Sequence, residues 1–117
     1  MPVRGMATRT IAGVEVLTVT ECPHRGMALD RVRQALDRVG ASQVVVTERV
    51  IDDLEGAAEA GMHGSPTVLI DGHDPFTATG VEASVSCRLF PTVSGFDGAP
   101  TVEDLIVALS QPGRTLQ

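Results

Sequence analysis

Two cysteines, Cys22 and Cys87, are the side chains of this sequence best suited to covalent chemistry. Cys22 follows the apolar, β-branched run 14–20 and precedes a helical pattern, so we expect it where a strand ends and a helix begins. Unpaired backbone N–H groups and the helix dipole favour an anion at such a point, and both lower the pKa of a thiol. Two basic residues, His24 and Arg25, stand close to Cys22. The sequence therefore predicts a reactive thiolate at Cys22, tuned by His24 and Arg25.

Pro23 supports this placement, because a proline suits the first helical turn, where its missing N–H would have no partner. The alternative for Cys22 is a small apolar residue that fills the end of a strand. Cys87 has the pattern of such a packing residue, since alternation puts it on the same strand face as Val85 and Leu89. We expect that face to lie against the core. A functional alternative stays open, in which the chain folds back and brings Cys87 to Cys22 for a disulfide or a metal.

The elements that must position these residues follow from the hydrophobic periodicity. Strands and helices alternate in the order β-α-β-α-β-β-α, at 14–20, 28–39, 43–48, 52–60, 64–72, 84–90 and 101–109. Asp52 or Asp53 is expected to cap the second helix, Gly61 to end it, and Thr101 to cap the third. This order predicts an α/β fold with a four-stranded mixed sheet and helices on both faces, the last two strands forming an antiparallel pair. Residues 13–111 form the predicted domain, between a loosely ordered leader (1–12) and a tail (112–117).

Composition excludes several classes of function. The chain has 117 residues, a formal charge of −6 and three Phe as its sole aromatic residues. A nucleic-acid surface needs basic stripes and usually stacking rings, so we expect no nucleic-acid partner. No apolar run reaches the roughly 20 residues that span a bilayer, and the leader has no apolar stretch of the signal-peptide kind. We expect no membrane partner and a cytoplasmic location, where two cysteines are more often reactive or buried thiols than a structural disulfide.

The element order combines with two short motifs to give a resemblance. Cys22-Pro23-His24 lies between a strand and a helix, and Ser65-Pro66-Thr67 opens a later strand. Over about residues 14–109 this resembles the thioredoxin-like superfamily, in which a Cys-x-x-Cys or Cys-x-x-Ser motif begins the first helix and a cis-proline faces it. The resemblance implies that Pro66 is cis. It also implies that Ser65, with Pro66, Thr67 and Pro23, forms a docking site where Ser65 offers backbone hydrogen bonds to an extended substrate.

This sequence departs from the superfamily at one position that matters for function. The second, resolving cysteine falls on Arg25, and a guanidinium cannot attack a mixed disulfide. Cys22 would then act as a monothiol oxidoreductase that forms a mixed disulfide with a low-molecular-weight thiol or a protein thiol or disulfide. An external thiol or Cys87 would resolve it. The loss of the resolving cysteine also leaves open a non-catalytic binding module of the same fold.

A narrower resemblance bears on metals. The runs 61–72, 74–76 and 86–89 are similar to short bacterial thioredoxin-like proteins sometimes labelled alkylmercury-lyase-like. Organomercurial lyases have an Asp three positions after their first cysteine; Arg25 stands there, so the proton donor has no counterpart. Mercury or another soft metal could still bind Cys22 with Cys87, because soft metals prefer thiolates. A set of Cys22, His24 and His63 matches no zinc spacing, and we predict neither a metal site nor a cofactor.

Overall fold

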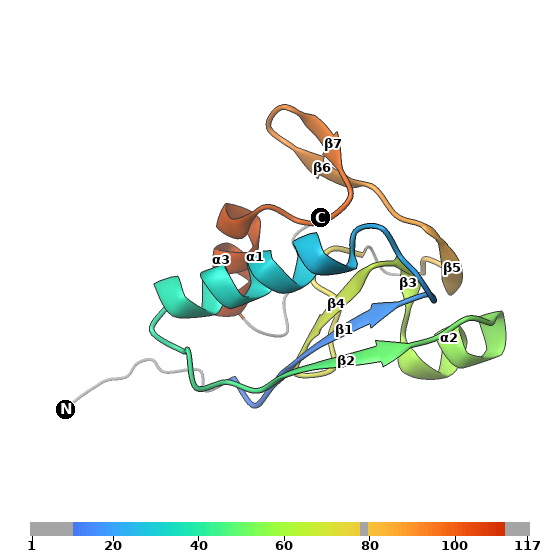
Figure 1. Ribbon diagram of the computed structural model, residues 1–117, viewed down its shortest axis with the longest axis horizontal. Helices are drawn as coiled ribbons and strands as arrows, with labels where there is room; N and C mark the ends of the chain where they lie inside the picture. Colours follow the sequence, from blue (N-terminus) through green and yellow to red (C-terminus); the bar gives the residue numbers. More distant parts are fainter. Residues whose placement is uncertain (1–10, 78–79, 112–117) are drawn as a thin grey trace.

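A mixed three-stranded sheet forms the centre of the computed structural model, which describes residues 11–77 and 80–111 (Figure 1). Its strand order is β2-β1-β4, with β1 at Val14–Thr18, β2 at Val46–Val50 and β4 at Thr67–Ile70. β1 pairs parallel with β2 and antiparallel with β4. The parallel pair follows from the helix that connects β1 to β2. Residues 1–10 of the predicted leader and the predicted tail 112–117 lie outside the described residues.

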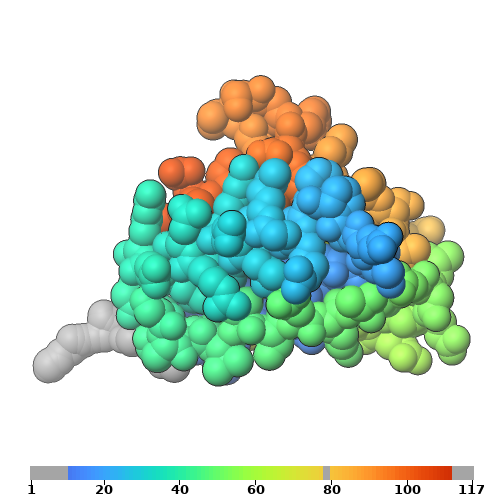
Figure 2. Space-filling view, viewed as in Figure 1, coloured from blue at the N-terminus to red at the C-terminus, as the bar shows by residue number. Residues whose placement is uncertain are grey.

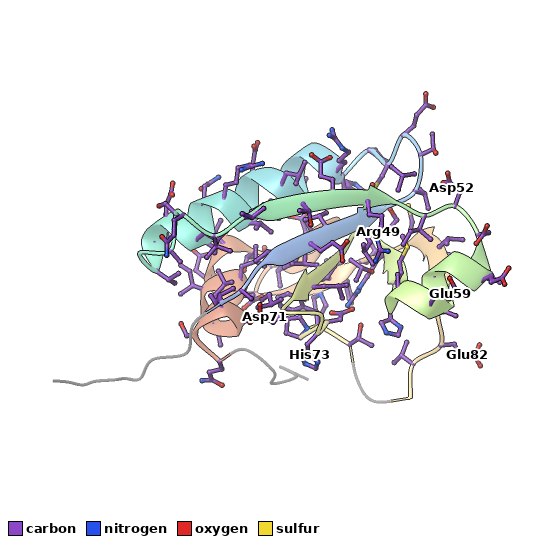
Figure 3. All side chains as sticks on the ribbon, turned by 90° about the horizontal axis from the view of Figure 1, so that it is seen from below. Arg49, Asp52, Glu59, Asp71, His73 and Glu82 are labelled. Atoms are coloured by element: carbon purple, nitrogen blue, oxygen red, sulfur yellow. The ribbon has the colours of Figure 1, made fainter. Side chains whose placement is uncertain are left out.

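Helices cover both faces of this sheet, as predicted (Figure 1). Helices α1 (Arg25–Arg38) and α3 (Val102–Ser110) pack on one face, over Val14, Val16, Val68 and Ile70. Helix α2 (Leu54–Ala60) lies at one end of the other face, where Ala57 joins a second buried cluster with Leu17, Ile51, Met62 and Leu69. Figure 3 looks onto this second face, where Arg49 of β2 pairs with Glu15 of β1 at 3.1 Å. None of the described helices is long and apolar enough to cross a membrane.

The predicted helix ends are confirmed where local capping chemistry sets them. Asp53 accepts a hydrogen bond from the Gly56 amide at 2.7 Å and so caps α2, while Gly61 ends that helix in the left-handed conformation. The Thr101 hydroxyl accepts from the Asp104 amide at 3.0 Å at the start of α3. α2 precedes β3 and α3 follows β7, so these two caps fix the starts of the helices on either side of strands β3 to β7.

The predicted strand 64–72 is split at Pro66, whose nitrogen has no hydrogen to give to a ladder. The residues before it form β3 (His63–Ser65), and β3 pairs in parallel with β5 (Ser84–Cys87) in a separate two-stranded sheet. The predicted antiparallel pair is therefore wrong, and the central sheet has three strands rather than four in the described part of the chain. Gly64 permits the close β3–β5 contact, since a Cβ there would lie 2.9 Å from the Arg88 Cβ.

A hairpin that the sequence did not predict follows β5. Strands β6 (Phe90–Thr92) and β7 (Gly95–Asp97) pair antiparallel and project from the body of the molecule, as the orange segment at the top of Figures 1 and 2 shows. Its base is held by the body: the Asp97 carboxylate pairs with Arg31 of α1 at 3.0 Å. The Phe90 ring packs edge-on against Phe76, with 5.8 Å between the ring centroids. Its tip is exposed.

Candidate functional site

Cys22 lies in the loop that joins β1 to α1. The Cys22 amide donates to the Val19 carbonyl at 3.2 Å, and the Cys22 carbonyl accepts from the Arg25 amide at 3.3 Å. Two successive turns therefore carry the chain from the sheet into the helix, and Glu21, within the first turn, takes a positive φ of 57°. Cys22 is a free thiol with 8% of its surface exposed. It stands three residues before the first helical residue, at the strand-to-helix junction that the sequence predicts.

The N-terminus of α1 has no side-chain cap. His24 occupies the N-cap position, but its side chain makes no capping hydrogen bond, and the first turn contains no acidic residue. The first amides of a helix have no partner within the helix, so without a cap this end keeps its preference for negative charge. A thiolate is a negative charge of this kind.

Two side chains from other elements fix the loop before Cys22. The Ser65 hydroxyl, in a residue only 2% exposed, accepts a hydrogen bond from the Val19 amide at 3.0 Å. Asp52 accepts from the Thr20 amide at 2.7 Å and from the Thr20 hydroxyl at 2.6 Å. The Thr20 hydroxyl, and then its amide, hold the pKa of Asp52 below the usual range of an aspartate. The loop is thus fastened on both sides, by β3 and by the chain after β2.

The Ser65–Pro66 peptide bond is cis, which confirms that prediction. Ser65, Pro66 and Thr67 are all buried. The Ser65 carbonyl already accepts from the Arg88 amide at 3.1 Å, so the chain's own β5 segment uses the backbone acceptor that we expected a substrate to use. Thr67 donates its hydroxyl hydrogen to the Gly64 carbonyl at 2.6 Å. Three of the four predicted docking residues, Ser65, Pro66 and Thr67, are therefore covered by the protein itself and do not face solvent.

The basic residues near Cys22 have partners of their own. Arg25 forms an ion pair with Glu48 of β2, and both side chains are largely exposed. The His24 ring lies directly against Gly98, where an added Cβ would clash with the ring carbons Cγ and Cδ2. The His24 Nδ1 atom is buried and has no hydrogen-bond partner among the described residues. Pro23, between Cys22 and His24, is exposed.

Asp97, at the base of the hairpin, carries a negative charge that faces α1, where it pairs with Arg31. Its pKa is lowered, first by the hydrogen bond from the Gly98 amide at 2.7 Å and then by Arg31, with a smaller contribution from His24. The base of the hairpin therefore makes polar contact with α1 through Asp97, which pairs with Arg31 and also feels the charge of His24. This contact positions His24 against Gly98.

A buried ion pair behind the Ser65-Pro66-Thr67 segment was not anticipated from the sequence. Arg88 pairs with Asp74 at 2.7 Å, and the two side chains are 10% and 5% exposed. The guanidinium also donates to the Thr77 hydroxyl at 2.8 Å and to the Thr67 hydroxyl at 3.3 Å, and lies 4.5 Å from the Phe90 ring centroid. The sequence offered no clear signal for this ion pair, because alternation puts Arg88 in register with Ser84 and Ser86, on the face that such a pattern predicts to be polar.

Cys87 is an exposed free thiol, so the prediction that it faces the core is wrong. Alternation puts Cys87 on the same strand face as Val85, and Val85 packs against the smaller core cluster, but that cover does not extend to Cys87 at the end of β5. Cys87 is the ladder partner of Ser65. Because Ser65 in turn binds the loop that carries Cys22, both thiols belong to the same end of the molecule.

The histidines and carboxylates form no metal centre in the part of the chain that the structure describes. No group of three or more His, Cys, Asp or Glu side chains there could hold an ion, so Cys22, His24 and His63 do not form one. The His63 Nδ1 atom lies 3.2 Å from the Glu82 carbonyl. His73 closes the tight turn with Ile70 at the end of β4.

Comparison with known proteins contributes no relative from which a role could be transferred. No family model, no curated protein and no solved structure matches the chain. The assignment of function therefore depends on the geometry around Cys22.

Proposed function

We propose that this protein has a thioredoxin-like fold and exchanges thiols and disulfides at Cys22 by a monothiol mechanism in the cytoplasm. The observation that carries the proposal is the hydrogen bond from the Val19 amide to the Ser65 hydroxyl. It fastens the Ser65-Pro66-Thr67 segment to the loop that holds Cys22 at the uncapped start of α1. This hydrogen bond joins two segments that are far apart in the sequence, residues 65–67 and the loop that contains Cys22.

The feature next to Cys22 that favours an anion is the uncapped start of α1. Arg25 contributes little to this preference, because Glu48 balances its charge and both side chains are largely exposed to solvent. His24 contributes through its packing under Gly98, which fixes the N-cap residue. The helix terminus remains as the source of preference for an anion, and neither an acidic side chain nor a cap competes for it.

The reaction is a displacement at sulfur. The Cys22 thiolate attacks one sulfur of a low-molecular-weight or protein disulfide, forms a mixed disulfide and releases the other sulfur as a thiolate that takes up a proton. A second thiol then attacks the mixed disulfide and frees Cys22. With 8% of the residue exposed, Cys22 meets small disulfides or a flexible protein segment more easily than a flat protein surface.

A second candidate is the binding of a soft metal by Cys22 and Cys87. The observation that favours it is the ladder pairing of Cys87 with Ser65, which brings a second, exposed thiol to the same end of the molecule. Two thiolates suit mercury(II) and similar ions. In this case tight binding of Hg(II) requires both cysteines, so the Cys87→Ser variant should lose it.

The test is the reaction of Cys22 with glutathione disulfide in the Cys87→Ser variant, which leaves Cys22 as its one thiol. We expect a mixed disulfide at Cys22, located by peptide mapping. The Cys22→Ser variant, which keeps the exposed Cys87, is the matched control. The absence of a mixed disulfide at Cys22 would sink the exchange mechanism and favour a non-catalytic binding module.

A further inference from the structure

Four contacts join the segment of Cys87 to the loop of Cys22. Cys87 is the ladder partner of Ser65, and the next residue, Arg88, donates its amide to the Ser65 carbonyl at 3.1 Å. The Ser65 hydroxyl accepts from the Val19 amide, and the Val19 carbonyl accepts from the Cys22 amide at 3.2 Å. The two thiols are therefore carried by adjoining segments.

β5, the strand that carries Cys87, lies where the resemblance places a substrate. The Ser65 backbone is where the thioredoxin resemblance places an extended substrate, and in this chain β5 binds there through Arg88. An internal strand that bears a thiol thus occupies the edge where a substrate strand and its cysteine would lie. The buried Arg88–Asp74 ion pair anchors β5 directly after Cys87 and keeps this register.

The two thiols also differ in exposure, and this difference suits a first attack by one sulfur and a second attack by the other. Cys22 is buried at the helix terminus, whereas Cys87 is exposed on a short strand whose other edge has no ladder partner among the described residues. An exposed side chain on such an edge can turn toward a neighbouring sulfur without breaking a core contact. Arg25, at the position of the superfamily's second cysteine, offers no competing thiol.

We propose that Cys87 is the resolving thiol of Cys22, an inference that rests on the exchange function proposed above. The Cys22 thiolate attacks a low-molecular-weight disulfide such as glutathione disulfide, which forms the mixed disulfide and releases one glutathione. The Cys87 thiolate then attacks the Cys22 sulfur, forms a Cys22–Cys87 disulfide and releases the second glutathione. Two protein thiols are oxidised, one external disulfide is reduced to two thiols, and the two protons pass to the released glutathiones.

The test uses the full chain, reduced and then mixed with glutathione disulfide, with acid quenching, intact mass measurement and peptide mapping over time. In the wild type we expect a short-lived adduct on Cys22 and then a monomer that has lost two hydrogens, with a Cys22–Cys87 linked peptide. In Cys87→Ser the adduct on Cys22 should persist at least roughly tenfold longer, because the second attack is no longer intramolecular. The double variant Ser84→Cys with Cys87→Ser moves the thiol to the other end of β5, opposite His63, and should also keep its adduct.

Far-UV circular dichroism of each variant establishes that the fold is retained; both substituted positions lie on β5, where Ser84 is half-buried and Cys87 exposed. A wild-type adduct as long-lived as that of Cys87→Ser, or a disulfide that joins two chains, would overturn the inference and leave the exchange function in place. If the double variant Ser84→Cys with Cys87→Ser loses its adduct as fast as the wild type, the position of Cys87 opposite Ser65 is not what permits its attack on Cys22. Absence of any adduct in Cys87→Ser would instead remove the exchange function itself, and the inference with it.

Discussion

The Ser65 hydroxyl and the Val19 amide, 3.0 Å apart, join the segment before Pro66 to the loop before Cys22. Removal of this hydroxyl leaves a partly buried N–H without a partner, so Ser65→Ala should lower the free energy of unfolding by about 1–3 kcal/mol. Urea denaturation measures this loss. Ser86→Ala, which removes an exposed hydroxyl from β5, is the control and should change stability by less than about 0.5 kcal/mol. Similar losses in both variants would contradict the role given to Ser65.

Asp52 makes the stability of the loop depend on pH. The Thr20 hydroxyl and amide lower its pKa in the folded protein below that of the unfolded chain. The stabilisation is therefore complete above the unfolded pKa and is lost as pH falls through the folded pKa. The difference in unfolding free energy between wild type and Asp52→Asn should be constant near neutral pH and shrink under acid conditions.

The donor can be tested separately from the carboxylate. Thr20→Val removes the hydroxyl and keeps the branched shape, so it should raise the pKa of Asp52 toward its ordinary value, as followed by NMR titration. If the titration of Asp52 is the same in this variant and the wild type, the hydroxyl is not the main cause of the lowered pKa.

Arg88 and Asp74 form the ion pair whose loss should cost most. Because both side chains are almost fully buried, Asp74→Asn leaves an unbalanced charge and should lower the free energy of unfolding by about 3–5 kcal/mol. The Glu15–Arg49 pair supplies a matched control in which the side chains are 31% and 51% exposed. Glu15→Gln should cost less than about 1 kcal/mol. Chemical denaturation of both variants in the same buffer compares them, and losses of equal size would refute the structural role of the buried pair.

Gly98 tests the packing of His24. An alanine there would place its Cβ against the His24 ring, and such overpacking should cost about 1–3 kcal/mol. Thermal and urea unfolding should show that His24→Ala recovers part of this loss in the Gly98→Ala background. Gly26→Ala, where a Cβ meets nothing within 4 Å, is the control and should be neutral or stabilising. An equal loss with and without the His24 ring would show that the clash lies elsewhere.

Local signals in the sequence predicted the features that depend on a few adjacent residues. Asp53 and Thr101 cap helices through amides three residues ahead, so their roles could be predicted within one turn of chain. The place of Cys22 between a strand and a helix, and the turn at the end of β4, follow from equally short patterns. For the site, the cis Ser65–Pro66 bond was predicted from a resemblance and not from the residues alone.

What the sequence could not provide was the identity of partners distant in the chain. Alternation groups Val85 and Cys87 on one strand face, but it does not say how far along the strand that face is covered. Val85 packs against the smaller core cluster, whereas Cys87, which the same pattern predicts to face the core, is exposed. The pairing of β5 with β3 depends on a close approach at Gly64 that no local pattern encodes. Glu48 was not expected to balance Arg25, because nothing near either residue identifies the other.

The β6–β7 hairpin is anchored on both sides of an exposed tip. Phe90 packs against Phe76 on the side of β5, while Asp97 and Gly98 contact α1 on the other side. A protease that cuts the tip near Val93 would therefore leave each new chain end tied to the body, since exposed loop tips are the usual sites of such nicks. The two fragments should stay associated under native conditions and separate when denatured, which makes the hairpin tip a natural place for insertion of a tag.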